Sequence, residues 1–160
     1  MRLAILLALS TALPTFPQTP EWDAFYAKQA EFRKRGDDAL KREQARRKAA
    51  LCANAANGND MSACLAAESK TTEANYLAYV RSIGALLRLT APETPRAATT
   101  ASRLPFDDAE SVWQAYREKA CAAMSMQWRS TQGDANQSCR LDLTGNHMDE
   151  LAKLYGDLWH

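Results

Sequence analysis

The chain has 160 residues, of which 46% are hydrophobic and 24% charged, and its formal net charge is +1. This composition is ordinary for a globular protein, and the length favours one domain that buries a sizeable core. A charge so close to neutral gives no global attraction to nucleic acid or to an anionic membrane, and neither is an expected partner.

The first twenty residues are predicted to be a signal peptide. Arg2 supplies a positive charge, residues 3–9 are an unbroken apolar run, and the segment from Ser10 to Ala12 fits a small-x-small cleavage pattern. The apolar run is too short to span a bilayer, which needs about 20 residues. A buried N-terminal helix is the alternative. The expected product is an exported chain, periplasmic or secreted, without a transmembrane segment.

Residues 21–51 are predicted to form a charged helix. They hold nine Lys or Arg against six Asp or Glu, and an apolar face is evident only in the first half, from Trp22 to Phe32. Gly36 is expected to break the segment. Two interpretations stay open: a basic surface for an acidic partner, or a solvated helical face.

The next helix follows a turn at residues 57–59, with Asp60 as its expected N-cap. Apolar side chains recur at helical spacing up to Leu86, and Glu68 is the one charge on that stripe. This carboxylate is expected to be either a buried ion-pair member or a rim residue. Residues 91–106 contain three prolines and are predicted to be a linker.

A third helix is expected to begin at Asp107 and to break at Gly133, and Thr144 is the predicted N-cap of a last helix. No strand pattern competes anywhere. The predicted fold class is therefore all-α, with about four helices arranged as two disulfide-stapled hairpins and a long charged helix at the N-terminus. The residues expected in the core are Leu65, Tyr79, Ile83, Trp113, Tyr116, Met124 and Leu151.

Four cysteines lie at positions 52, 64, 121 and 139. An even number in an exported chain predicts two disulfides, for which three pairings exist. The spacing, with turn residues between the members of each pair, favours Cys52–Cys64 and Cys121–Cys139. The spacings lack the C-x2-C pairs of zinc sites, so no metal is expected.

A search for catalytic motifs finds no nucleophile elbow, phosphate-binding loop or zinc-protease signature. His147 is interpreted as a surface residue in a first helical turn, and the alternative is a general base. A histidine base needs an orienting partner and a nucleophile, for which the sequence offers no context. Neither an enzyme nor a cofactor is expected.

One constellation on the third helix stands out. Residues 113, 116, 117 and 121 share a face, which places Arg117 beside Trp113, Tyr116 and a disulfide. A half-buried unpaired charge is costly, so Arg117 needs a partner, and Glu68 is the predicted one. The alternative is that Arg117 faces outward and contacts a ligand.

These residues carry a family resemblance. The matching patterns are Trp113-x-x-Tyr116-Arg117-Glu118-x-x-Cys121, Cys139-x-x-x-Leu143-Thr144 and Met61-x-x-Cys64-x-x-x-Glu68. Together they resemble the lysozyme inhibitor LprI-like family of small bacterial envelope proteins, over about residues 52–151, and residues 52–160 are taken as that domain. The resemblance implies a binding protein that inhibits lysozyme-type muramidases, with a c-type lysozyme as partner. The alternative is an envelope adaptor that docks a protein partner through residues 21–51.

Overall fold

The computed structural model describes residues 19–92, 105–127 and 132–159. Within these ranges every regular element is helical, which confirms the predicted all-α class. The elements are α1 (Pro20–Ala49), the 3₁₀ helix η1 (Leu51–Asn54), α2 (Gly58–Arg88), α3 (Pro105–Ser125), α4 (Gln132–Leu154) and the 3₁₀ helix η3 (Gly156–Trp159). Except for its last two residues, the predicted signal peptide lies outside the described ranges.

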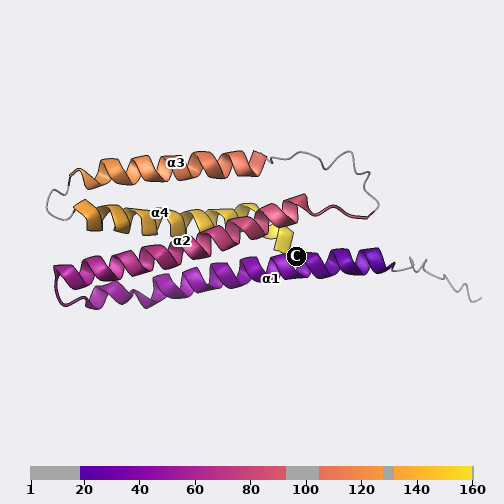
Figure 1. Cartoon of the computed structure of the whole chain (residues 1–160), viewed down its shortest axis with the longest axis horizontal. Helices are drawn as coiled ribbons and strands as arrows, with labels where there is room; N and C mark the ends of the chain where they lie inside the picture. The colour runs from indigo at the N-terminus through magenta and orange to yellow at the C-terminus, as the bar shows by residue number, and fades with distance from the viewer. Residues whose placement is uncertain (1–18, 93–104, 128–131, 160) are drawn as a thin grey trace, which may run out of the picture.

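The helices form two antiparallel hairpins that pack on each other. Figure 1 shows α2 and α4 in the middle, with α1 beside α2 and α3 beside α4. The disulfide Cys52–Cys64 closes the α1–α2 end, and Cys121–Cys139 closes the α3–α4 end. This is the pairing that the spacing favoured, and each bridge ties a helix to the segment that follows it.

The charged segment at the N-terminus is one continuous helix, so the predicted break at Gly36 is wrong. Gly36, Ala39 and Glu43 are buried, and α1 packs along α2. A glycine inside a helix costs about 1 kcal/mol relative to alanine. Contacts made along the whole hairpin offset so small a cost, and local propensity does not decide the outcome.

Two helix starts differ from the expectation. Asn57, not Asp60, caps α2: its Oδ1 accepts a hydrogen bond from the Asp60 backbone N–H at 3.0 Å. Helix α3 begins at Pro105, where a proline in the first turn loses no helical hydrogen bond. Phe106 lies in the core at 5% exposure, so these two residues belong to the helix and not to the linker. Residues 93–104 of that linker lie outside the described ranges.

Helix α4 runs without a break from Gln132, which overturns two further expectations. Gly133 lies in its first turn instead of interrupting a helix, and Thr144 lies in its middle instead of capping a new one. The Thr144 side chain is buried at 1% exposure and accepts a hydrogen bond from Arg117. Thr144 therefore serves a contact between helices and not the start of a helix, although threonine is a common N-cap residue.

The core lies where the two hairpins meet. Its members are Ala39, Tyr76, Tyr79, Ile83, Phe106, Met148 and Leu151. Leu65, Tyr79, Ile83 and Leu151 are buried as predicted, and Trp113 packs half-buried against the core. Tyr116 and Met124 are exposed by 58% and 49%, so their assignment to the core is wrong. The buried face of α3 instead runs through Phe106, Glu110, Arg117, Cys121 and Ser125.

In the part of the chain that the structure describes, no helix combines the length and the apolar character that a membrane crossing requires.

Candidate functional site

Arg117 lies at the centre of a polar cluster between α2, α3 and α4. Its side chain is only 4% exposed. Nη1 donates to a Glu73 carboxylate oxygen at 2.8 Å and to the Thr144 hydroxyl at 2.9 Å. The guanidinium carbon lies 5.1 Å from the ring centroid of Trp113 and 5.6 Å from that of Tyr76. The cation is thus paired by charge and flanked by aromatic rings, which makes its burial tolerable.

The predicted pairing of Arg117 with Glu68 is wrong. Glu68 accepts a hydrogen bond from Arg46 of α1 at 2.7 Å, and Glu73 is the partner of Arg117. Five residues along a helix correspond to a rotation of about 140°. Glu68 therefore faces α1, whereas Glu73 faces α3 and α4. Nothing in the sequence marks Glu73, because it lies off the apolar stripe of α2.

A second set of contacts surrounds Glu110, which is 5% exposed. Its carboxylate accepts a hydrogen bond from the Tyr76 hydroxyl at 2.8 Å and lies 3.0 Å from Nε2 of His147. Burial, together with the bond to Glu110, raises the pKa of Tyr76 above its usual value. The Tyr76 hydroxyl consequently stays protonated and remains a donor at any physiological pH.

His147 was expected at the surface in a first helical turn, and the structure corrects this. It lies in the second half of α4 with its side chain 11% exposed, and its ring stacks on Trp113. An enzymatic function for these residues would need Arg117, Glu68 and His147 to converge in an open cleft. Arg117 and His147 do lie in one cluster, but Glu68 is in another and the Glu110–His147 pair is closed off from solvent.

Glu43 organises a separate buried network between α1 and α2. It is 1% exposed and accepts hydrogen bonds from Arg46, Thr72 and Asn75 at 2.8, 3.1 and 3.2 Å. Burial by itself lowers the pKa of Arg46, but the hydrogen bonds to Glu43 and Glu68 more than offset this and raise it. The interpretation of residues 21–51 as a purely solvated face missed this network, since a Glu in a charged segment carries no sign of burial.

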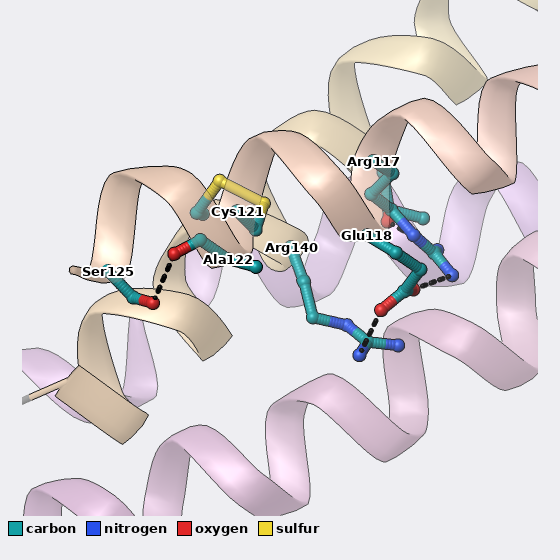
Figure 2. Close-up of a disulfide and its surroundings, with 8 residues drawn as sticks. Arg117, Glu118, Cys121, Ala122, Ser125 and Arg140 are labelled. Atoms are coloured by element: carbon teal, nitrogen blue, oxygen red, sulfur yellow. Dashed lines mark hydrogen bonds and ion pairs between the residues drawn. A yellow bond between two sulfur atoms is a disulfide. The ribbon is translucent and has the colours of Figure 1, made fainter.

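Figure 2 shows how the charged cluster reaches the surface beside the disulfide Cys121–Cys139. Glu118, one turn before Cys121 on α3, receives a hydrogen bond from Arg140 of α4 at 2.9 Å and lies 3.3 Å from a terminal nitrogen of Arg117. The Arg140–Glu118 ion pair and the covalent bridge thus join the same two helices, α3 and α4, at neighbouring levels. Of the remaining motif residues, Leu143 is half-buried on α4 and Tyr116 faces solvent.

An open polar groove of about 330 Å³ adjoins this cluster between α2 and α4. Glu73 and Thr144 line it from the cluster side, and Lys70 and Arg140 also line it. Ser69 Oγ and Gln137 Oε1, two further lining groups, are buried and have no hydrogen-bond partner among the described residues. Buried polar atoms in folded proteins are nearly always bonded, so two orphans in one groove call for an explanation. In the described ranges, no group of side chains is arranged to hold a metal ion.

The architecture is that of a small all-helical protein built from two disulfide-closed hairpins, with its motif residues in a buried cluster and a groove beside it. The chain belongs to the family described as Lysozyme inhibitor LprI, whose model matches residues 52–151. The match covers η1 except Leu51, all of α2 and α3 and nearly all of α4, hence both disulfides and the whole Arg117 cluster, and it leaves out α1. No curated protein and no solved structure matches the chain.

Proposed function

We propose that the protein is an exported, non-enzymatic binding protein that inhibits lysozyme-type muramidases. One observation carries the proposal: the match to an inhibitor family spans the same residues, 52–151, that build the Arg117 cluster and the groove beside it. Two disulfides agree with an oxidising compartment outside the cytoplasm. They also hold the helices rigid before binding, which lowers the entropic cost of forming a complex.

We propose the groove between α2 and α4 as the surface that meets the muramidase. Ser69 Oγ and Gln137 Oε1 are buried at its wall without a bond to any described residue, and a partner could supply the missing bonds if these side chains rotate toward it. Lys70 and Arg140 lie beside them. The catalytic cleft of a lysozyme carries two carboxylates, which such cations complement.

Long-range charge supports the same partner. Residues 52–160 hold ten Lys or Arg against thirteen Asp or Glu, an excess of three negative charges. Animal lysozymes are basic, so this part of the chain attracts them weakly, whereas the surplus of three positive charges in residues 21–51 opposes the attraction. Added salt weakens both effects.

The test is an inhibition assay with purified, oxidised chain lacking the signal peptide. It is expected to slow cell-wall lysis by a c-type lysozyme at a near-stoichiometric ratio, and to lose this effect after its disulfides are reduced and blocked. Absence of any slowing by the oxidised protein ends the proposal. The mass of the exported form checks the export step, since an intact N-terminus would exclude cleavage.

A matched pair of variants tests the surface. Gln137→Ala is expected to weaken inhibition severalfold without destabilising the fold, because the Gln137 Oε1 atom makes no bond within the described chain. Gln44→Ala removes the same side chain from an exposed position on α1 and is expected to leave inhibition unchanged. Equal inhibition by both variants would place the contact elsewhere.

The alternative function, an envelope adaptor docking through residues 21–51, has an observation of its own. Trp22, Phe25 and Tyr26 form an aromatic cluster with ring centroids 5.4–5.5 Å apart, and Tyr26 is 50% exposed. Figure 1 shows that this end of α1 extends past the end of α2. Aromatic residues are enriched at protein interfaces. A Trp22→Ala, Tyr26→Ala variant that loses a co-purifying envelope protein while still inhibiting lysozyme would support the adaptor function.

A further inference from the structure

A second groove, of about 500 Å³, lies between α1 and α2, on residues that the Arg117 cluster does not use. Arg35 and Arg42 line it from α1, and Arg81 lines it from α2. Ala78 and Ala85, also lining residues, are small and apolar. The groove therefore presents three guanidinium groups along a channel whose α2 wall is partly apolar.

The charges that line this groove are not balanced. Asp38 is its one acidic lining residue, and it is already paired with Lys34 at 2.6 Å. The hydrogen bond to Lys34 holds the pKa of Asp38 below its usual value, and the positive charges of Arg42 and Lys41 act in the same direction. The surroundings of this carboxylate are thus dominated by cations.

Two of the arginines have unused hydrogen-bonding capacity. Arg81 has no hydrogen bond or ion pair with any residue that the structure describes. Among the described residues, Arg42 bonds through Nε alone, which donates to the Asn75 amide oxygen at 3.1 Å. Asn75 is 4% exposed and donates in turn to Glu43 at 3.2 Å, so a buried chain of bonds orients Arg42 while its terminal nitrogens stay available.

We propose that this groove binds an extended acidic peptide segment of a protein partner, with carboxylates paired to Arg42 and Arg81. Guanidinium groups bind carboxylates through two parallel hydrogen bonds, and the two terminal nitrogens offer one such geometry even where Nε is already bonded. The site is separate from the groove proposed to contact a muramidase. It therefore stands whether or not the chain inhibits one.

The spacing of the arginines defines the ligand further. Arg35 is paired with Glu31 on the same helix, so a ligand carboxylate would compete with Glu31 there. Arg35 and Arg42 are seven residues apart on α1, which is about 10.5 Å along the helix axis. In a polyproline II segment, residues three apart lie on the same edge and about 9.3 Å from each other. Acidic residues at every third position match this spacing.

The test measures fluorescence anisotropy of a labelled peptide with the repeat Glu-Pro-Ala, titrated with the oxidised chain lacking its signal peptide. The proposal expects saturable binding that is at least fivefold tighter than that of a peptide with the same residues and all Glu adjacent, and no binding of the Gln-Pro-Ala peptide. Arg81→Gln is expected to weaken binding about tenfold, the size of one lost charge-assisted contact. Because Arg81 is exposed and unbonded, this variant keeps the fold, which circular dichroism verifies.

Lys119→Gln is the matched control, since it removes one positive charge from an exposed position on α3. It is expected to change the affinity less than twofold. Equal weakening by the two variants, or equal affinity for both arrangements of Glu, would reduce the effect to general charge attraction and overturn the site. Failure of the peptide to bind would overturn it as well. Binding to phosphatidylglycerol vesicles that depends on Arg81, without peptide binding, would assign the groove to a membrane surface instead.

Discussion

The indole ring of Trp113 lies flat on the imidazole ring of His147, with centroids 3.9 Å apart and ring planes inclined by 9°. This stack joins α3 to α4. Glu110 fixes the edge of the imidazole through Nε2, and Arg117 lies within 5.1 Å of the indole centroid. Trp113 thus contacts both His147, a polar side chain of α4, and Arg117, a buried polar side chain of α3. A substitution of Trp113 therefore tests most directly whether the cluster stabilises the fold.

Replacing Trp113 with alanine is expected to lower the free energy of unfolding by about 2–3 kcal/mol. The loss is smaller than the roughly 3–5 kcal/mol for a fully buried aromatic side chain because Trp113 is half-buried. Urea denaturation followed by circular dichroism measures it. Val112→Ala, at a neighbouring position with 70% exposure, is expected to change stability by less than about 0.5 kcal/mol. Similar losses in both variants would contradict a packing role for Trp113.

Arg117→Gln is expected to cost about 3 kcal/mol. The change leaves the buried Thr144 hydroxyl and the partly exposed Glu73 carboxylate without their cation, and breaking a buried pair on one side is strongly destabilising. Arg140→Gln breaks an exposed pair with Glu118 and is expected to cost less than about 1 kcal/mol. Thermal and urea unfolding of the two variants provide the comparison. The outcome against the prediction is an Arg117 variant as stable as the Arg140 variant.

Glu43→Ala is expected to lower stability by about 3 kcal/mol, because Arg46, Thr72 and Asn75 lose their shared acceptor in a buried site. Glu31→Ala removes an exposed carboxylate that is paired with Arg35 on the same helix, and its cost is expected to stay below about 0.5 kcal/mol. Hydrogen exchange at the α1–α2 contact gives a local readout. Unchanged protection there in the Glu43 variant would show that the network does not hold the hairpin.

Stability is expected to fall as the pH rises above about 10, partly because of Tyr76. Its pKa is raised in the folded chain, whereas in the unfolded chain it has the ordinary value near 10. Below pH 10 both states keep the proton and the contribution of Tyr76 is fully present. Above it the unfolded state loses the proton first, and this favours unfolding by up to about 1.4 kcal/mol per pH unit.

The matched measurement compares unfolding of the natural chain and of Tyr76→Phe at pH 9 and pH 11. The phenylalanine variant starts less stable, since Glu110 loses a donor, but its stability is expected to depend less on pH. Identical pH dependence in the two proteins would mean that Tyr76 ionises equally well in both states.

Short-range features of the sequence determined the helical class and the apolar stripe of α2, and they favoured one of the three possible disulfide pairings. The apolar period of α2 is the face that packs in the core, since burial of one face is what selects a helical period. The cysteines of each pair are separated by 12 and 18 positions, so an antiparallel hairpin brings them together without any knowledge of the remaining chain. The match of the motif residues to the family followed from the same local patterns.

Only the tertiary structure decided where the charges go. Arg117 and Glu73 are 44 positions apart, and which carboxylate of α2 meets the cation depends on the rotation of that helix against α3. The orientation of α3 in the bundle turned Tyr116 to solvent, although it was expected in the core, and placed Glu110 inside. A buried charge is tolerated only with a partner, and the partner comes from another helix. Local patterns therefore determined the helical class and the apolar face of α2, and contacts between helices decided the continuity of α1 and the partner of each buried charge.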